Sequence, residues 1–140
     1  MIQLIVGEKG KGKTKVLLDK VNSEFKTAHG SIVYLDKSTK HMYELNNKVR
    51  LIDVSSFGLK NSDEFIGFVY GILSQDHDLE QMYLDSFLTI ASVSTDEEIA
   101  HAIEKLDVIS EKYNVRFVLS VSKDKEKLPE CAKAKIVISL

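Results

Sequence analysis

Residues 7–14 read Gly-Glu-Lys-Gly-Lys-Gly-Lys-Thr, and they follow directly on the apolar run Ile2-Gln3-Leu4-Ile5-Val6. The spacing matches the G-x-x-x-x-G-K-[ST] phosphate-binding loop, in which successive backbone amides surround a phosphate. Glycine supplies the backbone angles that this cradle requires. Beyond the loop, apolar residues recur at helical spacing, namely Val16, Leu17, Val21, Phe25 and Ala28. A strand, this loop and a helix in succession predict a nucleotide site at the start of the chain.

Each polar residue of the loop has an expected task. Lys13 is expected to reach the β and γ phosphates as an exposed, catalytic loop lysine, and Thr14 to offer its hydroxyl to Mg²⁺. The positive end of the following helix favours the anion. The residues expected to contact nucleotide are Gly7, Glu8, Lys9, Gly10, Lys11, Gly12, Lys13, Thr14 and Lys15. The alternative is a Gly/Lys-rich turn without a ligand, which the flanking strand and helix disfavour.

Composition indicates one globular domain spanning 1–140, since 140 residues with 44% hydrophobic content can bury a core. The net charge is −2 and basic residues are scattered, which gives no reason to expect a nucleic-acid surface. The longest apolar stretch, 65–73, is too short to span a bilayer, and the chain opens on a strand and not a signal peptide. The single Cys131 excludes an internal disulfide and is expected to be a core residue. We therefore expect a cytoplasmic protein.

Predicted strands and helices alternate, which is typical of an α/β three-layer sandwich with a mainly parallel sheet. Asn61 with Glu64 and Thr95 with Glu98 form candidate capping boxes for two amphipathic helices. The segment 81–86 suits a helix as well as a strand. The predicted strands are 2–6, 31–36, 49–54, 81–86, 115–121 and 134–139.

Three aspartates stand at predicted strand ends, where ligands of parallel sheets gather. Asp85, in Met82-Tyr83-Leu84-Asp85-Ser86, is the best candidate for the Mg²⁺ carboxylate. Asp36 is the second candidate, whereas Asp53 is better explained as a turn residue. A strand-end aspartate can also simply cap the next helix.

The order of these motifs resembles the RecA/KaiC-type P-loop NTPase core over nearly the full length. The resemblance rests on the phosphate loop, on Val33-Tyr34-Leu35-Asp36, on the strand at 50–56, on Tyr83-Leu84-Asp85-Ser86 and on Phe117-Val118-Leu119-Ser120. It implies a minimal core with a sheet ordered 5-1-4-3-2 plus an extra strand, and it places the 115–121 strand between the phosphate-loop strand and the metal-acid strand. ATP and Mg²⁺ are the implied ligands. Guanine is disfavoured because Ser122-Lys123-Asp124 does not match N-K-x-D.

Departures from the family pattern concern hydrolysis. Ser38 and Ser86 stand where related ATPases carry a water-polarising glutamate, which leaves Asp36 as the substitute base. Arg50 and Arg116 fall at strand starts, so neither resembles an arginine finger. The remaining cations, Lys123, Lys125 and Lys127, are better explained as a solvated loop.

Two functions remain open. The chain is either an ATPase of low intrinsic turnover, raised by a protein partner or by homo-oligomerisation, or an ATP-binding regulatory module that does not hydrolyse.

Overall fold

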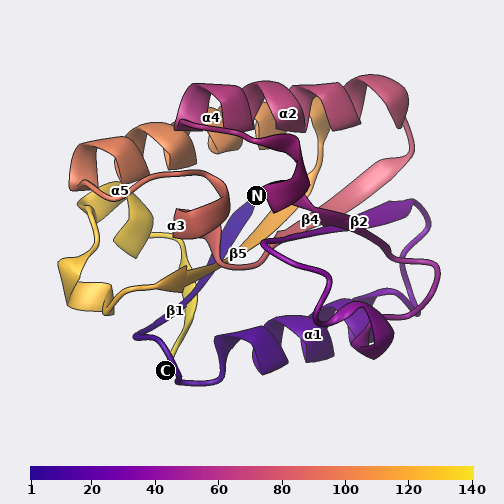
Figure 1. The fold of residues 1–140 in the computed structure, drawn as a ribbon, viewed down its shortest axis with the longest axis horizontal. Helices are drawn as coiled ribbons and strands as arrows, with labels where there is room; N and C mark the ends of the chain where they lie inside the picture. Colours follow the sequence, from indigo (N-terminus) through magenta and orange to yellow (C-terminus); the bar gives the residue numbers. More distant parts are fainter.

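A six-stranded, all-parallel sheet forms the centre of the protein in a computed structural model that describes residues 1–140 (Figure 1). The strands are β1 (Ile2–Gly7), β2 (Ser31–Asp36), β3 (Arg50–Asp53), β4 (Leu79–Leu84), β5 (Arg116–Ser122) and β6 (Ile136–Ser139). All six predicted strands are present, with ends shifted by up to two residues. The segment that suited either a helix or a strand is strand β4, which ends at Leu84 and places Asp85 just beyond the strand.

The α-helices are α1 (Lys13–Glu24), α2 (Ser62–Gln75), α3 (Phe87–Ile90), α4 (Asp96–Tyr113) and α5 (Glu130–Lys133). Three short 3₁₀ helices, η1 (Met42–Glu44), η2 (Val54–Phe57) and η3 (Lys125–Lys127), lie in the connections. None of the helices is both long enough and apolar enough to cross a membrane.

The strand order is β3-β2-β4-β5-β1-β6. With all six strands numbered along the chain, this order reads 3-2-4-5-1-6, which differs from the predicted order 5-1-4-3-2. The difference arises because the chain turns back after β2 and lays β3 along its outer side, so that β3 becomes the edge and β2 pairs directly with β4. When β3 is set aside and the other strands are renumbered along the chain, they read 5-1-4-3-2. Strand β5 lies between β1 and β4, where we expected the 115–121 strand.

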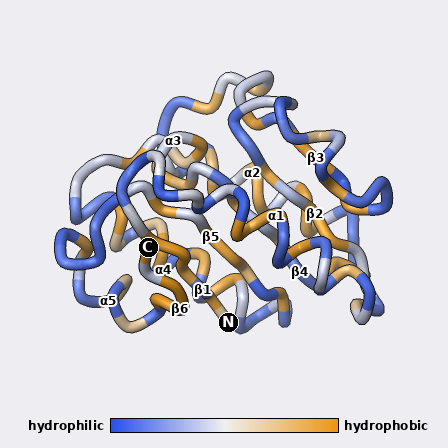
Figure 2. Tube along the Cα trace, turned by 90° about the horizontal axis from the view of Figure 1, so that it is seen from below, coloured by the Kyte–Doolittle hydropathy of each residue, from blue (hydrophilic) through white to orange (hydrophobic).

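Helices cover both faces of the sheet and make three layers (Figure 1). Helix α1 lies on one face, where Leu17 and Val21 pack against Ile5, Tyr34 and Val118. Helices α2, α3 and α4 lie on the other face, over a larger apolar core. Figure 2 shows hydrophobic strands through the middle and hydrophilic segments around the outside. The sheet is therefore buried on both sides, as parallel sheets are.

Side-chain caps fix where the two longest helices begin. The Asn61 side chain accepts a hydrogen bond from Glu64 N–H at the start of α2. Glu64 in turn accepts from Lys60 N–H, not from Asn61 as a full capping box requires. At the start of α4, Thr95 and Glu98 cap one another reciprocally, so that capping box is confirmed.

The cysteine prediction needs correction. Cys131 lies on α5 and is only half-buried, because this one-turn helix packs at the margin of the core through its neighbour Ala132. Burial still raises the pKa of the Cys131 thiol above its ordinary value.

Candidate functional site

The carboxyl ends of the parallel strands meet at one edge of the sheet, and strand alternation decides which face each end residue occupies. Tyr34 and Tyr83 belong to the apolar cluster beneath α1. Asp36 and Asp85 come two residues later in the chain and therefore continue on the same face. This alternation places both carboxylates beside the loop that leads into α1.

The loop between β1 and α1 owes its shape to glycine. Gly10 has φ 88° and Gly12 has φ 92°, in the left-handed region that is costly for other residues. Gly12 is also the N-cap of α1, so the loop turns straight into the helix.

Lys13 spans this loop. Its Nζ donates to the backbone carbonyl of Glu8 at 3.0 Å. The side chain is buried, with 6% exposure, which corrects the expectation of an exposed lysine. Burial lowers the pKa of the ammonium group, whereas the nearby Asp85 charge acts in the opposite direction.

Asp85 is the centre of a buried hydrogen-bond network. Its Oδ1 accepts from Thr14 Oγ1 at 3.2 Å and from Ser120 Oγ at 2.7 Å, and its Oδ2 accepts from Tyr34 Oη at 2.8 Å. Burial, together with the Asp85 charge, raises the pKa of Tyr34, so the phenol stays a proton donor. Three hydroxyls from α1, β5 and β2 thus hold one carboxylate in place.

The residue after Asp85 is in an unusual conformation. Ser86 has φ 55°, which is uncommon for a residue other than glycine. Its N–H donates to Ser120 Oγ at 2.8 Å, and Ser120 in turn donates to Asp85. The strained turn between β4 and α3 is therefore tied to the same carboxylate, as is common at functional sites.

Asp36 is equally buried but far less satisfied. Its Oδ1 accepts from Lys37 N–H at 2.7 Å, while its Oδ2 is buried without any hydrogen-bond partner. Burial, and secondarily the charge of Asp85, raise the pKa of Asp36 to about 6, against the opposing effects of Lys37 and His41. A carboxylate with one free oxygen and a pKa near neutrality can exchange a proton with a bound molecule.

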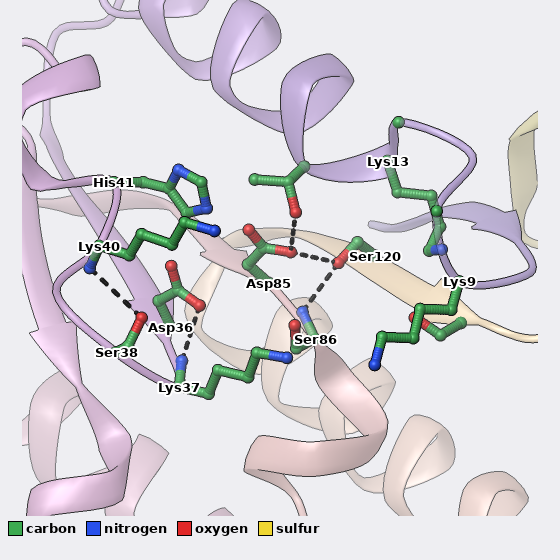
Figure 3. Close-up of a pocket in the computed structure, with 14 residues that line it drawn as sticks. Lys9, Lys13, Asp36, Lys37, Ser38, Lys40, His41, Asp85, Ser86 and Ser120 are labelled. Atoms are coloured by element: carbon green, nitrogen blue, oxygen red, sulfur yellow. Dashed lines mark hydrogen bonds between the residues drawn. The ribbon is translucent and has the colours of Figure 1, made fainter.

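These groups surround a polar cavity of about 270 Å³, drawn in Figure 3. Of the residues expected to contact nucleotide, five line the cavity. None of its 14 lining residues is hydrophobic. The lining residues are Lys9, Gly10, Gly12, Lys13, Thr14, Asp36, Lys37, Ser38, Lys40, His41, Asp85, Ser86, Ser120 and Ser122.

Four loop residues expected at the site, Gly7, Glu8, Lys11 and Lys15, do not line this cavity. Gly7 completes β1, where an added Cβ would lie 3.1 Å from the Cβ of Leu140. Lys15 faces solvent and pairs with Asp19 at 3.1 Å. The structure therefore separates residues that shape the loop from those that face the cavity.

The other strand-end aspartate behaves as a turn residue. The Asp53 carboxylate accepts from Ser55 N–H at 3.0 Å and caps η2. Arg50 and Arg116 begin β3 and β5, at the opposite end of the sheet, and pair with Asp76 and Glu24. The interpretation of these three residues from sequence agrees with the structure.

Several residues were not identified from the sequence as part of the site: Ser120, Lys40 and His41, which line the cavity, and Tyr34, which lies beneath it and donates to Asp85. Tyr34 and Ser120 were interpreted only as strand residues. A signal existed for each: Tyr34 is a polar residue two positions before the strand-end Asp36, and Ser120 is a polar residue within an apolar strand. Lys40 and His41 gave no signal, because the path of the chain after β2 decides where they lie. Lysines outnumber aspartates four to two around the cavity, which makes it positive in a chain of net charge −2.

Comparison of the chain with protein-family models and with curated proteins found no significant match.

Proposed function

We propose that this chain is an ATP-binding P-loop protein and a Mg²⁺-dependent ATPase of low intrinsic turnover, of the RecA/KaiC-like type. One observation carries the proposal. The Thr14 hydroxyl, at the start of α1, hydrogen-bonds at 3.2 Å to Asp85, which follows β4. In the sheet, β4 is separated from β1, the strand that precedes the phosphate loop, by β5 alone. In P-loop proteins this threonine and a strand-end aspartate serve the same Mg²⁺ ion.

The residues at the cavity suit Mg²⁺. A hydroxyl and a carboxylate are hard oxygen donors, which Mg²⁺ prefers. The structure contains no group of three or more His, Cys, Asp or Glu residues able to hold a metal by themselves. This agrees with a Mg²⁺ ion held by one or two protein ligands together with phosphates and water. Thr14 and Asp85 would hold the ion, which would supply charge neutralisation at the phosphates.

Slow hydrolysis follows from the groups available to activate water. Ser38 and Ser86 both line the cavity, and neither hydroxyl accepts a proton at neutral pH. Asp36 is the remaining base, with a free oxygen and a pKa of about 6. A well-placed base typically contributes a factor of roughly 10² to 10⁴. We infer that Asp36 supplies part of this factor and Lys13 stabilises charge on the phosphates.

The two serines also favour a second candidate, an ATP-binding regulatory module without useful hydrolysis. Phosphate release measured over a range of protein concentrations separates the two. An ATPase activated by self-assembly gains rate faster than linearly, whereas a binding module releases no phosphate above background.

Calorimetric titration with Mg²⁺-ATP tests the binding itself. Lys13→Met keeps the buried aliphatic stem but removes the charge, and it should abolish measurable affinity while the urea midpoint shows a folded protein. Lys26→Ala, on an exposed residue outside the cavity, is the matched control and should bind as the wild type does. Unchanged affinity in folded Lys13→Met protein would refute the site.

A further inference from the structure

The cavity has a second cationic wall opposite the phosphate loop, formed by the segment 37–41 after β2. Lys37, Ser38, Lys40 and His41 line the cavity from this side. In Figure 3, Lys37 and Lys40 extend from one side toward Asp85 and Ser86, and Lys9 approaches from the other side. The two walls come from segments more than 20 residues apart in the chain.

The cavity lysines have no ionic partner within the protein. Five lysines elsewhere, including Lys15, Lys123 and Lys135, pair with carboxylates within 4.0 Å. Lys37, Lys40 and Lys9 take part in no such pair, and neither does Lys13, although Asp36 and Asp85 share their cavity. Unpaired ammonium groups gathered at one cavity lower its affinity for cations and raise it for anions.

Local hydrogen bonds hold the backbone of this segment beside the cavity. Lys37 N–H donates to Asp36 Oδ1 at 2.7 Å, and Lys40 N–H donates to Ser38 Oγ at 3.3 Å. His41 pairs with Glu44 at 2.5 Å.

Further on, the connection is tied to α1. Asn22 Nδ2 donates to the Glu44 carbonyl at 2.8 Å, and Asn46 N–H donates to Asn22 Oδ1 at 2.9 Å. The helix that begins at the phosphate loop thus also holds the segment that faces it.

Charge matching indicates what the second wall binds. The four lysines and two aspartates of the cavity give a net charge of +2, and a Mg²⁺ ion would bring this to +4. A nucleoside triphosphate carries about four negative charges at neutral pH, because the second pKa of its terminal phosphate lies near 6. One bound triphosphate therefore balances both walls, and a second anionic substrate would leave uncompensated negative charge.

We propose, resting on the proposed nucleotide-binding function, that Lys37 and Lys40 bind the terminal phosphate and make the 37–41 segment the part of the site that distinguishes triphosphate from diphosphate. The phosphate loop holds the phosphates that ATP and ADP share. The terminal phosphate extends toward the opposite wall, where the two unpaired lysines lie.

Calorimetry with Mg²⁺-ATP and Mg²⁺-ADP tests this inference on a Lys37→Ala/Lys40→Ala double variant. Both lysines are exposed, so the variant should fold. We expect ATP affinity to fall roughly tenfold or more, as for lost charge-assisted hydrogen bonds, with ADP affinity changed less than about threefold. The matched control is Lys48→Ala, an exposed lysine of the same connection that does not line the cavity.

The outcomes separate the two proposals. A wild-type protein that binds neither nucleotide overturns both. If the wild type binds ATP, two results for the double variant overturn only the role of the 37–41 segment. In one, the ratio of ATP affinity to ADP affinity is unchanged; in the other, both affinities are lost equally. A ratio that falls in the double variant and stays constant in Lys48→Ala supports it.

Discussion

Replacing Asp36 with asparagine should stabilise the protein above pH 6. The Asp36 side chain is 2% exposed, and its Oδ2 has no hydrogen-bond partner, so keeping it ionised costs folding free energy. Asparagine has nearly the same shape and no charge, and its carbonyl oxygen can still accept from Lys37 N–H. A gain in stability when a buried charge is removed is typical of a residue that is retained for function.

The magnitude follows from the pKa of Asp36, about 6 in the folded protein against 3.8 for an ordinary aspartate. At 1.36 kcal/mol per pH unit the cost of ionisation reaches about 3 kcal/mol, and screening by solvent in the cavity reduces it to between about 1 and 3 kcal/mol. Because the folded-state pKa is raised, the folded state binds more protons between pH 3.8 and 6 than the unfolded state. Wild-type stability therefore falls as pH rises through this window.

Urea unfolding of both proteins at pH 4 and at pH 8 measures the effect. The stability difference should be near zero at pH 4 and should favour Asp36→Asn by about 1 to 3 kcal/mol at pH 8. Asp53→Asn is the control, since Asp53 is the register partner of Asp36 on β3 but already accepts two hydrogen bonds from Ser55. A destabilised Asp36→Asn protein at pH 8, or a difference independent of pH, would refute the reasoning.

Three further predictions concern the metal, the base and the loop. Asp85→Asn should weaken ATP binding mainly when Mg²⁺ is present, and Asp53→Asn should leave it nearly unchanged; equal losses in titrations with and without Mg²⁺ would show that Asp85 does not hold the ion. The rate of phosphate release by the wild type should lie well below about 1 s⁻¹ and should decline as pH falls through about 6, where Asp36 gains a proton. Ser38→Glu should raise this rate, and a fast wild-type enzyme would contradict the prediction. In urea unfolding, Gly12→Ala should lower the free energy of unfolding by about 1 to 2 kcal/mol because the φ of Gly12 is 92°. The control is Gly67→Ala, in the interior of α2 with free space for a Cβ, which should raise the free energy of unfolding by about 0.5 to 1 kcal/mol. Similar shifts in both variants would argue against backbone strain at Gly12.

Most of the fold could be predicted from local sequence, because it depends on signals that neighbouring residues carry. The apolar runs identified all six strands, and Thr95 with Glu98 marked the start of α4. The position of β3 could not be predicted in this way. Its pairing with β2 depends on how the 37–49 connection returns across the sheet, which is a property of the assembled chain.

Within the candidate site, the proximity of Thr14 and Asp85 could be predicted, because for both residues the residue type and the place in the chain indicate the same position. It was not predictable where burial decides the property. Nothing in the sequence indicates that Lys13 is buried or that Asp36 has a free oxygen, since both depend on which side chains pack around them. The contribution of Lys40 likewise depends on a turn whose path residue types alone do not specify.

The composition of the cavity wall bears on selectivity among nucleotides. Binding sites that recognise an organic ring usually offer it apolar or aromatic contact. This cavity offers no hydrophobic side chain, since none of its 14 lining residues is hydrophobic, and the His41 imidazole is its one aromatic ring. If the proposed function holds, most of the affinity comes from the phosphates, which all nucleoside triphosphates share. Competition between two nucleotides would then follow their phosphate number and their concentrations, so the protein would respond to the phosphorylation state of the nucleotide pool more than to the identity of one base.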